Sequence, residues 1–303
     1  MPDTFEVGPR AYRLAALAAK GLPTAVTAPA ASLLGLAFAQ AMRDRRTTVE
    51  RHLRRVKGPM SEIAARRATQ AAFDFYARYW LESFRLPGLS REDVEADYSI
   101  DGYGHVLDGL RAGNGVILAL PHLGGWEWAG RWAVDQGVRM TVIVEPLADR
   151  ETFEWFVSFR RSLGMTVVPL GPDAGTASMR ALKNNEVLAL LCDRDIAGGG
   201  IEVEFFGERT TLPAGPATLA LRTGAPIVPT AVYFTGRHGH RGVVRPPLAL
   251  ERTGRLRDDV ARVTQLIAAA LEKLIRVAPE QWHLFQPNWP SDPGYGEEQG
   301  KRG

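Results

Sequence analysis

Apolar runs and amphipathic segments alternate along the chain from about residue 110 onward. Five short runs are rich in Val, Ile and Leu without strict polar alternation, which is typical of strands covered on both faces. These runs lie at 116–120, 141–145, 165–169, 187–191 and 227–233. Helical patterns are expected at 125–136, 149–163, 175–184, 213–223 and 257–277. This order predicts an α/β fold, with a central mostly parallel sheet flanked by helices on both faces.

Two further segments complete the expected architecture. The stretch 61–86 is predicted to form a long helix rich in aromatic residues, which a Pro-Gly pair ends. Apolar and charged residues alternate along 201–206, which indicates a half-exposed strand. No obvious linker, repeat or low-complexity tract divides the 303 residues, so we expect a single domain, 1–303. The polar tail at 290–303 is expected to be disordered.

The N-terminal segment 1–60 is the basic part of the chain. It carries ten basic and four acidic side chains, a net charge of +6, against +3 for the whole chain. Its cations alternate with apolar, alanine-rich stretches, a pattern typical of amphipathic helices at an anionic membrane surface. The alternative is a helix that packs on the core of a soluble protein and has a solvated basic flank. We expect no nucleic-acid partner.

No residue between Lys20 and Arg43 is charged, so a membrane span has to be considered. Pro23 and Pro29 interrupt this stretch, and only 30–42 has the pattern of an unbroken helix. That helix is too short to cross a hydrocarbon core of ~30 Å. We therefore expect a peripheral contact with the membrane.

The segment from His122 to Glu127 follows the first apolar run and contains a pair of glycines. A histidine at a strand end, with an acid in the first turn of the next helix, suits a base that takes a proton from an alcohol. The glycines allow another backbone or a ligand to approach closely. The alternative is structural: His122 would precede a helix, and Glu127 would be a first-turn charge favoured by the helix dipole.

Asp193, Arg194 and Asp195 follow the strand predicted at 187–191. Ligands of parallel α/β sheets bind beyond the carboxyl ends of the strands, so this segment and His122 are expected to share a site. The two acids can orient a histidine and hold a substrate hydroxyl. Asp-x-Asp is also typical of divalent-metal sites for nucleotide sugars, although the chain has no G-x-G-x-x-G or other Gly-rich phosphate loop. A surface loop with an internal ion pair is the third interpretation.

Cys192 precedes this acidic segment and is the chain's single cysteine. An intramolecular disulfide is therefore excluded. Its position at the end of an apolar strand indicates a buried packing residue rather than a thiol nucleophile.

Two more segments carry candidate site residues. Glu145 ends a predicted strand, and Arg160 and Arg161 lie in the helix that follows it. An arginine near a strand-end site suits phosphate or carboxylate binding because its planar fork offers paired donors, and the alternative is a solvated helix charge. Near the C-terminus, 282–289 alternates aromatic residues with polar ones such as His283. This segment either lines a sugar or lipid pocket or closes the core.

Residues 120–127 resemble the H-x4-D/E block of the lipid A biosynthesis acyltransferases and their actinobacterial relatives. The resemblance is greatest to the phosphatidylinositol mannoside acyltransferases. It covers most of the chain, and each motif alone is weak, but together they are specific. Further matching motifs, in order, are 77–87, 159–164, 193–195, 204–207, 212–217 and 282–289.

The resemblance implies transfer of a fatty acyl group from acyl-CoA to a mannose hydroxyl of a phosphatidylinositol mannoside, at the cytoplasmic face of the membrane. His122 would be the base, Glu127 fills the acidic position of the block, and Asp193 matches a carboxylate paired with the base. Glu145 and Arg160 would line the site. Relatives have Asp where this chain has Glu127, and Glu where it has Asp193. Which acid orients His122 therefore stays open.

The expected reaction needs acyl-CoA as co-substrate and no cofactor or metal. Neutral His122 would remove the hydroxyl proton as the sugar oxygen attacks the thioester, and the coenzyme A thiolate would leave. Donors near the paired glycines at 124–125, or at 198–200, would hold the oxyanion. The other residues expected to contact a substrate are Arg194, Asp195, Gly199 and His283.

Three other functions remain open at this point. The first is an acyltransferase that uses the same histidine–acid block and acylates a different lipid, such as a glycerolipid or a lipid A-like acceptor. Alternatively, the protein would be a metal-dependent glycosyltransferase that uses Asp193, Arg194 and Asp195. A catalytically silent membrane-binding protein would keep the basic N-terminal segment and have no need of His122.

Overall fold

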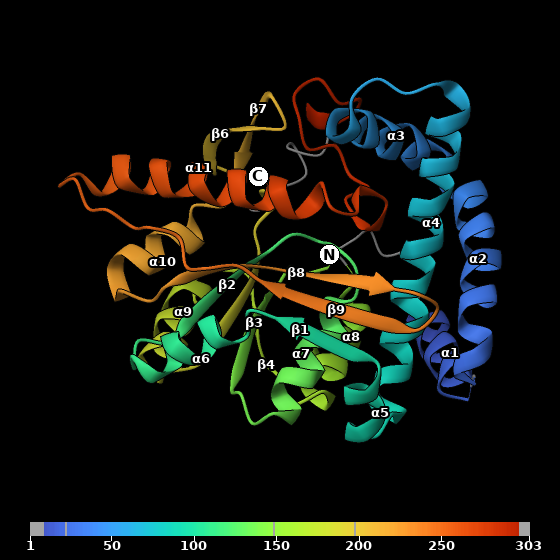
Figure 1. Cartoon of the computed structure of the whole chain (residues 1–303), viewed down its shortest axis with the longest axis horizontal. Coiled ribbons are helices and arrows are strands. Elements are labelled where there is room, and N and C mark those ends of the chain that lie inside the picture. The colour runs from blue at the N-terminus through green and yellow to red at the C-terminus, as the bar shows by residue number, and fades with distance from the viewer. Residues whose placement is uncertain (1–8, 22, 148, 197, 297–303) are drawn as a thin grey trace.

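The computed structural model describes residues 9–21, 23–147, 149–196 and 198–296. A seven-stranded sheet with the order β1-β9-β8-β2-β5-β3-β4 forms the centre of the molecule (Figure 1). Its strands are β1 (Tyr98–Asp101), β2 (Val116–Leu120), β3 (Met140–Val144), β4 (Thr166–Pro169), β5 (Val187–Leu191), β8 (Ile227–Thr235) and β9 (Gly239–Val244). Within this sheet, as the described residues form it, β8 and β9 pair antiparallel and the other neighbouring strands pair parallel. The predicted mostly parallel sheet is confirmed, and the five predicted strands belong to it.

Helices cover both faces of the sheet, and in Figure 1 α11 lies above it while α6 and α7 lie below. One face packs against α6 (Gly104–Arg111), α7 (Trp126–Asp135) and α8 (Arg150–Ser162), and the other against α9 (Ala174–Lys183), α10 (Gly215–Thr223) and α11 (Leu256–Ile275). Neighbouring residues of a strand point to opposite faces. Val116 of β2 accordingly belongs to the apolar cluster that contains Trp132 of α7, whereas Ile117 belongs to the core beside α11.

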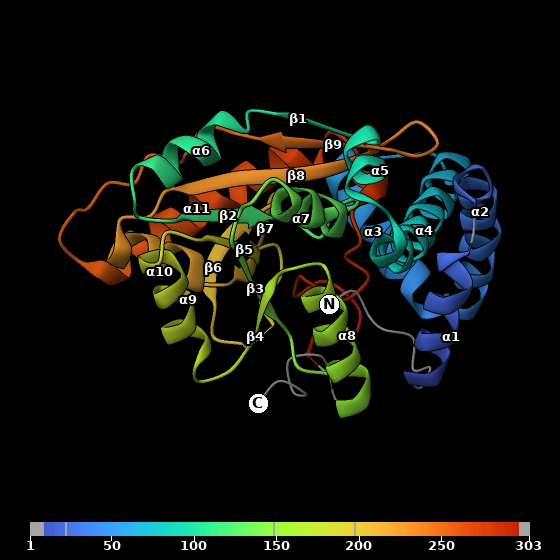
Figure 2. The same ribbon diagram turned by 90° about the horizontal axis from the view of Figure 1, so that it is seen from below.

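Four N-terminal helices lie together at one end of the sheet, opposite α9 and α10 (Figure 2). They are α1 (Pro9–Lys20), α2 (Thr24–Ala41), α3 (Arg43–Lys57) and α4 (Glu62–Arg85), and the short α5 (Arg91–Ala96) follows. The predicted aromatic helix is α4, which Ser61 caps by accepting a hydrogen bond from the Ala64 backbone N–H.

Helix α2 is longer than the sequence predicted. It begins at Thr24 and contains Pro29, although we expected an unbroken helix only at 30–42. Pro29 lies in the second turn, where its missing N–H removes one helical hydrogen bond without ending the helix. No helix in the described part of the chain is both long and apolar enough to cross a membrane. Residues 1–8 and 22 of the predicted membrane-contacting segment lie outside the described residues.

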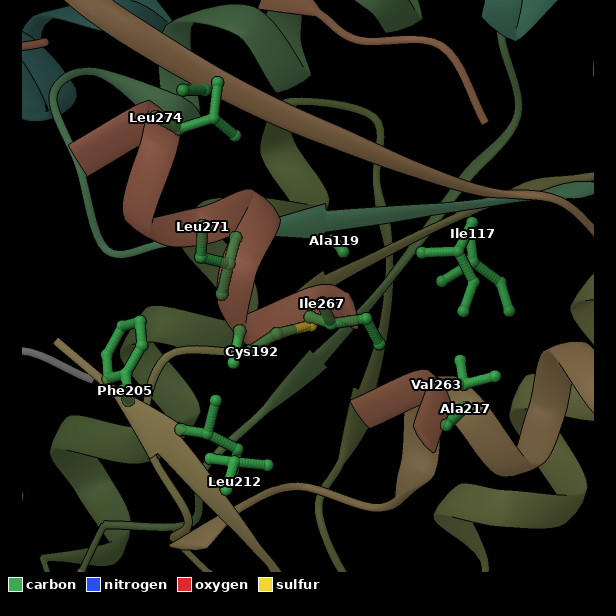
Figure 3. Packing of buried hydrophobic residues seen from close by; sticks show 14 of the residues in the cluster. Ile117, Ala119, Cys192, Phe205, Leu212, Ala217, Val263, Ile267, Leu271 and Leu274 are labelled. Carbon is green, nitrogen blue, oxygen red and sulfur yellow. The ribbon is translucent and has the colours of Figure 1, made fainter. Parts of the chain in front are cut away.

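A separate antiparallel hairpin, β6 (Ile201–Phe205) and β7 (Glu208–Leu212), packs beside α11. Burial alternates along β6 as predicted for a half-exposed strand. Figure 3 shows Phe205 and Leu212 in one cluster with Cys192, next to the apolar side chains of α11. Cys192 is buried, and this burial raises the pKa of its thiol far above the ordinary value. Its interpretation as a packing residue is confirmed.

The central sheet splits between β3 and β5 at its carboxyl end. Pairing of β3 with β5 stops at Val142 and Ala189, whereas β5 stays paired with β2 up to Leu191. Meanwhile β3 remains paired with β4 up to Val144. The residues around this split are only partly buried although their strands are central: Val142, Ile143, Ala189, Leu190 and Leu191.

Of the tail expected to be disordered at 290–303, the structure describes residues 290–296. Asp292 is buried against α3, where an oxygen of its carboxylate lies 3.0 Å from Nε2 of His52 and the other lies 3.3 Å from the Arg55 guanidinium. These partners come from about 240 residues earlier in the chain, so local composition does not reveal them. Residues 297–303 lie outside the described residues.

Candidate active site

The loop after β2 holds His122 in a fixed position. Gly124 has φ +62°, and a Cβ atom there would lie 1.9 Å from the carbonyl oxygen of Val232, so only glycine fits. Its N–H donates to the Gln281 carbonyl at 2.9 Å, and the His283 N–H donates to the His122 carbonyl at 2.7 Å. The close backbone approach predicted for this glycine pair is present, and it joins the loop to the segment from residue 281.

Asp193 lies directly beside the His122 ring. Its Oδ1 is 2.7 Å from His122 Nδ1, and its Oδ2 accepts a hydrogen bond from the His122 backbone N–H at 2.9 Å. The Trp282 indole N–H donates to Oδ2 at 2.7 Å. Burial alone would raise the pKa of Asp193, but the contacts with His122 and Trp282 outweigh burial and lower it. The acid in contact with His122 is therefore Asp193, which answers the question that the sequence left open.

Glu127 has a different set of partners. The Arg160 guanidinium donates to its Oε1 at 2.5 Å, and the Tyr79 hydroxyl donates to the same oxygen at 3.3 Å. All three side chains are buried. Burial and the adjacent Glu127 charge raise the pKa of Tyr79, so its hydroxyl stays a donor. Glu127 thus fixes Arg160 rather than His122, although the sequence motif places it five residues from the histidine.

A cavity of about 610 Å³ opens at these residues. The predicted site residues that line it are His122, Glu127, Glu145, Arg160, Arg194, Asp195 and Gly199. Most other lining residues are apolar, and those around the split between β3 and β5 belong to the wall. Nε2 of His122 has no hydrogen-bond partner among the described residues, and neither has one terminal nitrogen of Arg160. The site therefore combines a buried base, a buried cation and a large apolar space.

Asp193 and Asp195 do not act as a pair. Asp195 accepts hydrogen bonds from the backbone N–H groups of Gly198 at 3.1 Å and Gly200 at 2.8 Å, whereas Asp193 contacts His122. A guanidinium nitrogen of Arg194 lies 3.7 Å from a carboxylate oxygen of Glu145. Within the described ranges, no group of three His, Cys, Asp or Glu side chains is placed to hold a metal ion. The Asp-x-Asp metal interpretation thus has no support in the arrangement of these carboxylates.

His283 lies apart from the cavity that we expected it to line. It is 1% exposed and is surrounded by the rings of Tyr76, Tyr79, Trp126 and Phe234. Burial lowers the pKa of His283 to about 3, so the ring is neutral at physiological pH. His283 does not line the cavity, and of the two interpretations of 282–289, core closure describes this residue.

Three residues at the site were not given these roles by the sequence analysis. Trp282 donates a hydrogen bond to Asp193, Tyr79 donates one to Glu127, and Arg222 of α10 lines the cavity. Trp282 and Tyr79 lie in motifs that matched the family. The motifs alone do not show which atoms these side chains contact.

The sequence profile of the bacterial lipid A biosynthesis acyltransferases matches residues 11–291. The chain belongs to this acyltransferase family. A phosphatidylinositol mannoside acyltransferase of Mycobacterium tuberculosis is 40% identical over 228 residues, which cover 73% of this chain and 70% of the relative. One of the same name from Mycolicibacterium smegmatis is 36% identical over 247 residues, covering 80% and 79%. The resemblance to the phosphatidylinositol mannoside acyltransferases, which the sequence motifs indicated, is thus confirmed.

Proposed function

We propose that this protein transfers a fatty acyl group, such as palmitoyl, from acyl-CoA to a mannose hydroxyl of a phosphatidylinositol mannoside, at the cytoplasmic face of the membrane. The observation that carries this proposal is the His122–Asp193 pair at the wall of a large apolar cavity. The names of relatives at 36% and 40% identity support the acceptor class.

The hydrogen bond to Asp193 determines which nitrogen of His122 acts as the base. The Asp193 carboxylate accepts a hydrogen bond from Nδ1–H, so the neutral ring has its free electron pair on Nε2. Nε2 removes the hydroxyl proton while the sugar oxygen attacks the thioester carbonyl. Collapse of the tetrahedral intermediate breaks the C–S bond, and the thiolate takes the proton from the imidazolium. General-base action of this kind contributes roughly 10²–10⁴-fold to the rate.

The shape of the cavity supports acyl-CoA as the donor. Apolar side chains on the α7 side of the sheet, including Leu118, Trp132 and Met165, offer a lining for a fatty acyl chain. On the other side, Gly199 and Arg222 offer a backbone N–H and a guanidinium to the phosphates of the coenzyme. The thioester would then lie near His122, between the apolar part of the cavity on the α7 side and the part lined by Gly199 and Arg222. The unpartnered nitrogen of Arg160 is a donor for the developing oxyanion.

The surface of α2 and α3 supports a peripheral contact with an anionic membrane. Leu33 and Leu36 of α2 are 70% and 52% exposed, and the exposed Gln40 follows on the same helical face. Gln40 also lines a groove of α3 with four arginines, of which Arg43 and Arg46 have no ion-pair partner within the described residues. An apolar row that runs into a basic groove suits insertion below anionic headgroups.

The test is acyl transfer by the purified full-length protein. Palmitoyl-CoA is offered with phosphatidylinositol mannoside, a glycerolipid and a lipid A-like acceptor, and products are identified by mass spectrometry. We expect palmitoylation of the mannoside, abolished by His122→Ala and retained by His105→Ala on α6. If His122→Ala kept more than a few per cent of the rate, His122 would not be the base. Preferred transfer to another acceptor would overturn the acceptor assignment alone.

A further inference from the structure

Asp193 receives one hydrogen bond that neither His122 nor the loop after β2 provides. Its carboxylate is fully buried and accepts three donors: the ring and the backbone of His122, and the indole N–H of Trp282. The two donors of His122 move together with the base. Trp282 is therefore the independent group that sets the orientation of the carboxylate plane.

Trp282 is itself firmly held. It is buried, its backbone pairs with Leu123 as an isolated antiparallel bridge, and its ring contacts Phe206 with centroids 5.7 Å apart. The bridge lies between the hydrogen bond from Gly124 to Gln281 and the hydrogen bond from His283 to His122. The base and the donor to its carboxylate partner are thus positioned by one stretch of paired backbone.

We propose that Trp282 is a positioning residue for acyl transfer: its indole N–H holds Asp193 in the orientation that keeps the proton on Nδ1 of His122. This inference rests on the proposed function, because it takes His122 as the base. Trp282 does not contact a substrate, since it does not line the cavity. Its effect should therefore appear in turnover and depend on the Asp193 carboxylate.

Trp289 offers a matched control. It is buried in the same apolar cluster, stacks on Phe205, and donates its indole N–H to the Phe205 carbonyl at 3.0 Å. Trp282→Phe and Trp289→Phe remove the same number of atoms and one indole hydrogen bond each. Only the first of these bonds goes to Asp193.

The experiment compares kcat and KM for palmitoyl-CoA in both variants, alone and combined with Asp193→Asn. Loss of a hydrogen bond to a charged group corresponds to a change of roughly 10- to 150-fold, so Trp282→Phe should lower kcat by about this factor with KM within about twofold. Trp289→Phe should change kcat by less than about threefold. In the Asp193→Asn background, the effect of Trp282→Phe on kcat should largely disappear, because its target carboxylate is gone.

Equal losses of kcat in the two tryptophan variants would overturn the inference, and so would a Trp282→Phe loss that persists undiminished with Asn at position 193. If Trp282→Phe fails to fold, benzothienylalanine at position 282 removes only the N–H donor, and the same outcomes apply. His122→Ala is measured in parallel. Acyl transfer by that variant would overturn His122 as the base, and absence of acyl transfer by the unaltered protein would overturn the proposed function. An inactive His122→Ala with equal tryptophan variants would overturn only the role of Trp282.

Discussion

The membrane contact proposed for α2 and α3 can be separated into an apolar and an electrostatic part. Leu33→Ser/Leu36→Ser removes the exposed apolar row, and Arg43→Ala/Arg46→Ala removes two cations from the adjacent groove. Both pairs lie away from the cavity, so acyl transfer to a detergent-dispersed acceptor should be retained.

The two effects differ in magnitude and in salt dependence. Each cation near an anionic surface contributes about 1 kcal/mol, so loss of two should weaken binding by roughly 30-fold. Complete burial of a leucine side chain is worth about 1.5–3 kcal/mol. Insertion of side chains that are 70% and 52% exposed would then contribute about 2–4 kcal/mol together. Salt screens the arginine part and leaves the leucine part in place.

The assay is co-sedimentation with vesicles of phosphatidylcholine, with and without phosphatidylglycerol, at low and high salt. We expect the arginine variant to lose affinity only for anionic vesicles at low salt, and the leucine variant to lose it under all conditions. Arg255→Ala/Arg257→Ala is the control, because these exposed residues begin α11 at the opposite end of the molecule from α2 (Figure 1). If the control lost as much affinity as the arginine variant, net charge and not the groove would direct binding. Unchanged binding of the leucine variant would refute insertion of α2.

Three further predictions concern the site and the C-terminal end. Asp193→Asn should lower kcat by about 10³–10⁴-fold with little effect on acyl-CoA binding; Glu127→Gln should lower it less, because Glu127 contacts Arg160 and not His122. Steady-state kinetics would contradict this ranking if the two losses were equal. Arg222→Ala should raise KM for acyl-CoA about tenfold and leave kcat nearly unchanged, which a kcat loss at saturation would disprove. Burial opposes ionisation of Asp292, but His52 and other contacts outweigh it and hold the pKa below its unfolded value of about 3.9. The stabilisation is therefore present above about pH 4 and is lost as pH falls below it, so Asp292→Asn should lower Tm at pH 7 more than at pH 3. An equal Tm difference at both pH values would show that the charge of Asp292 does not matter.

The central strands were predictable because they are buried on both faces and carry continuous apolar runs. The edge strand β1 and its neighbour β9 were missed: β1 is short and half exposed, and β9 contains two glycines and an arginine. β7 was missed because its sequence is mostly polar. In each case the strand is recognisable only beside the partner that it pairs with.

The position of the site was predictable, but its internal contacts were not. His122 and Asp193 follow neighbouring parallel strands, so topology alone brings them to one edge of the sheet. The choice between Asp193 and Glu127 depends on side-chain reach, which spacing does not determine. Trp282 and Asp193 share a hydrogen bond although 89 positions separate them in the sequence. Asp292 and His52 share one across 240 positions. Contacts of this kind are set by tertiary packing.

The split between β3 and β5 makes the volume of the cavity and the stability of the fold depend on the same side chains. Val142, Ile143 and Leu190 stand in the middle of the sheet, where a tightly packed protein would fill the gap with larger residues or complete the pairing. Either change would add contacts to the folded state and remove space from the cavity. Variants selected only for heat resistance should therefore accumulate substitutions at this split and lose long-chain substrates first.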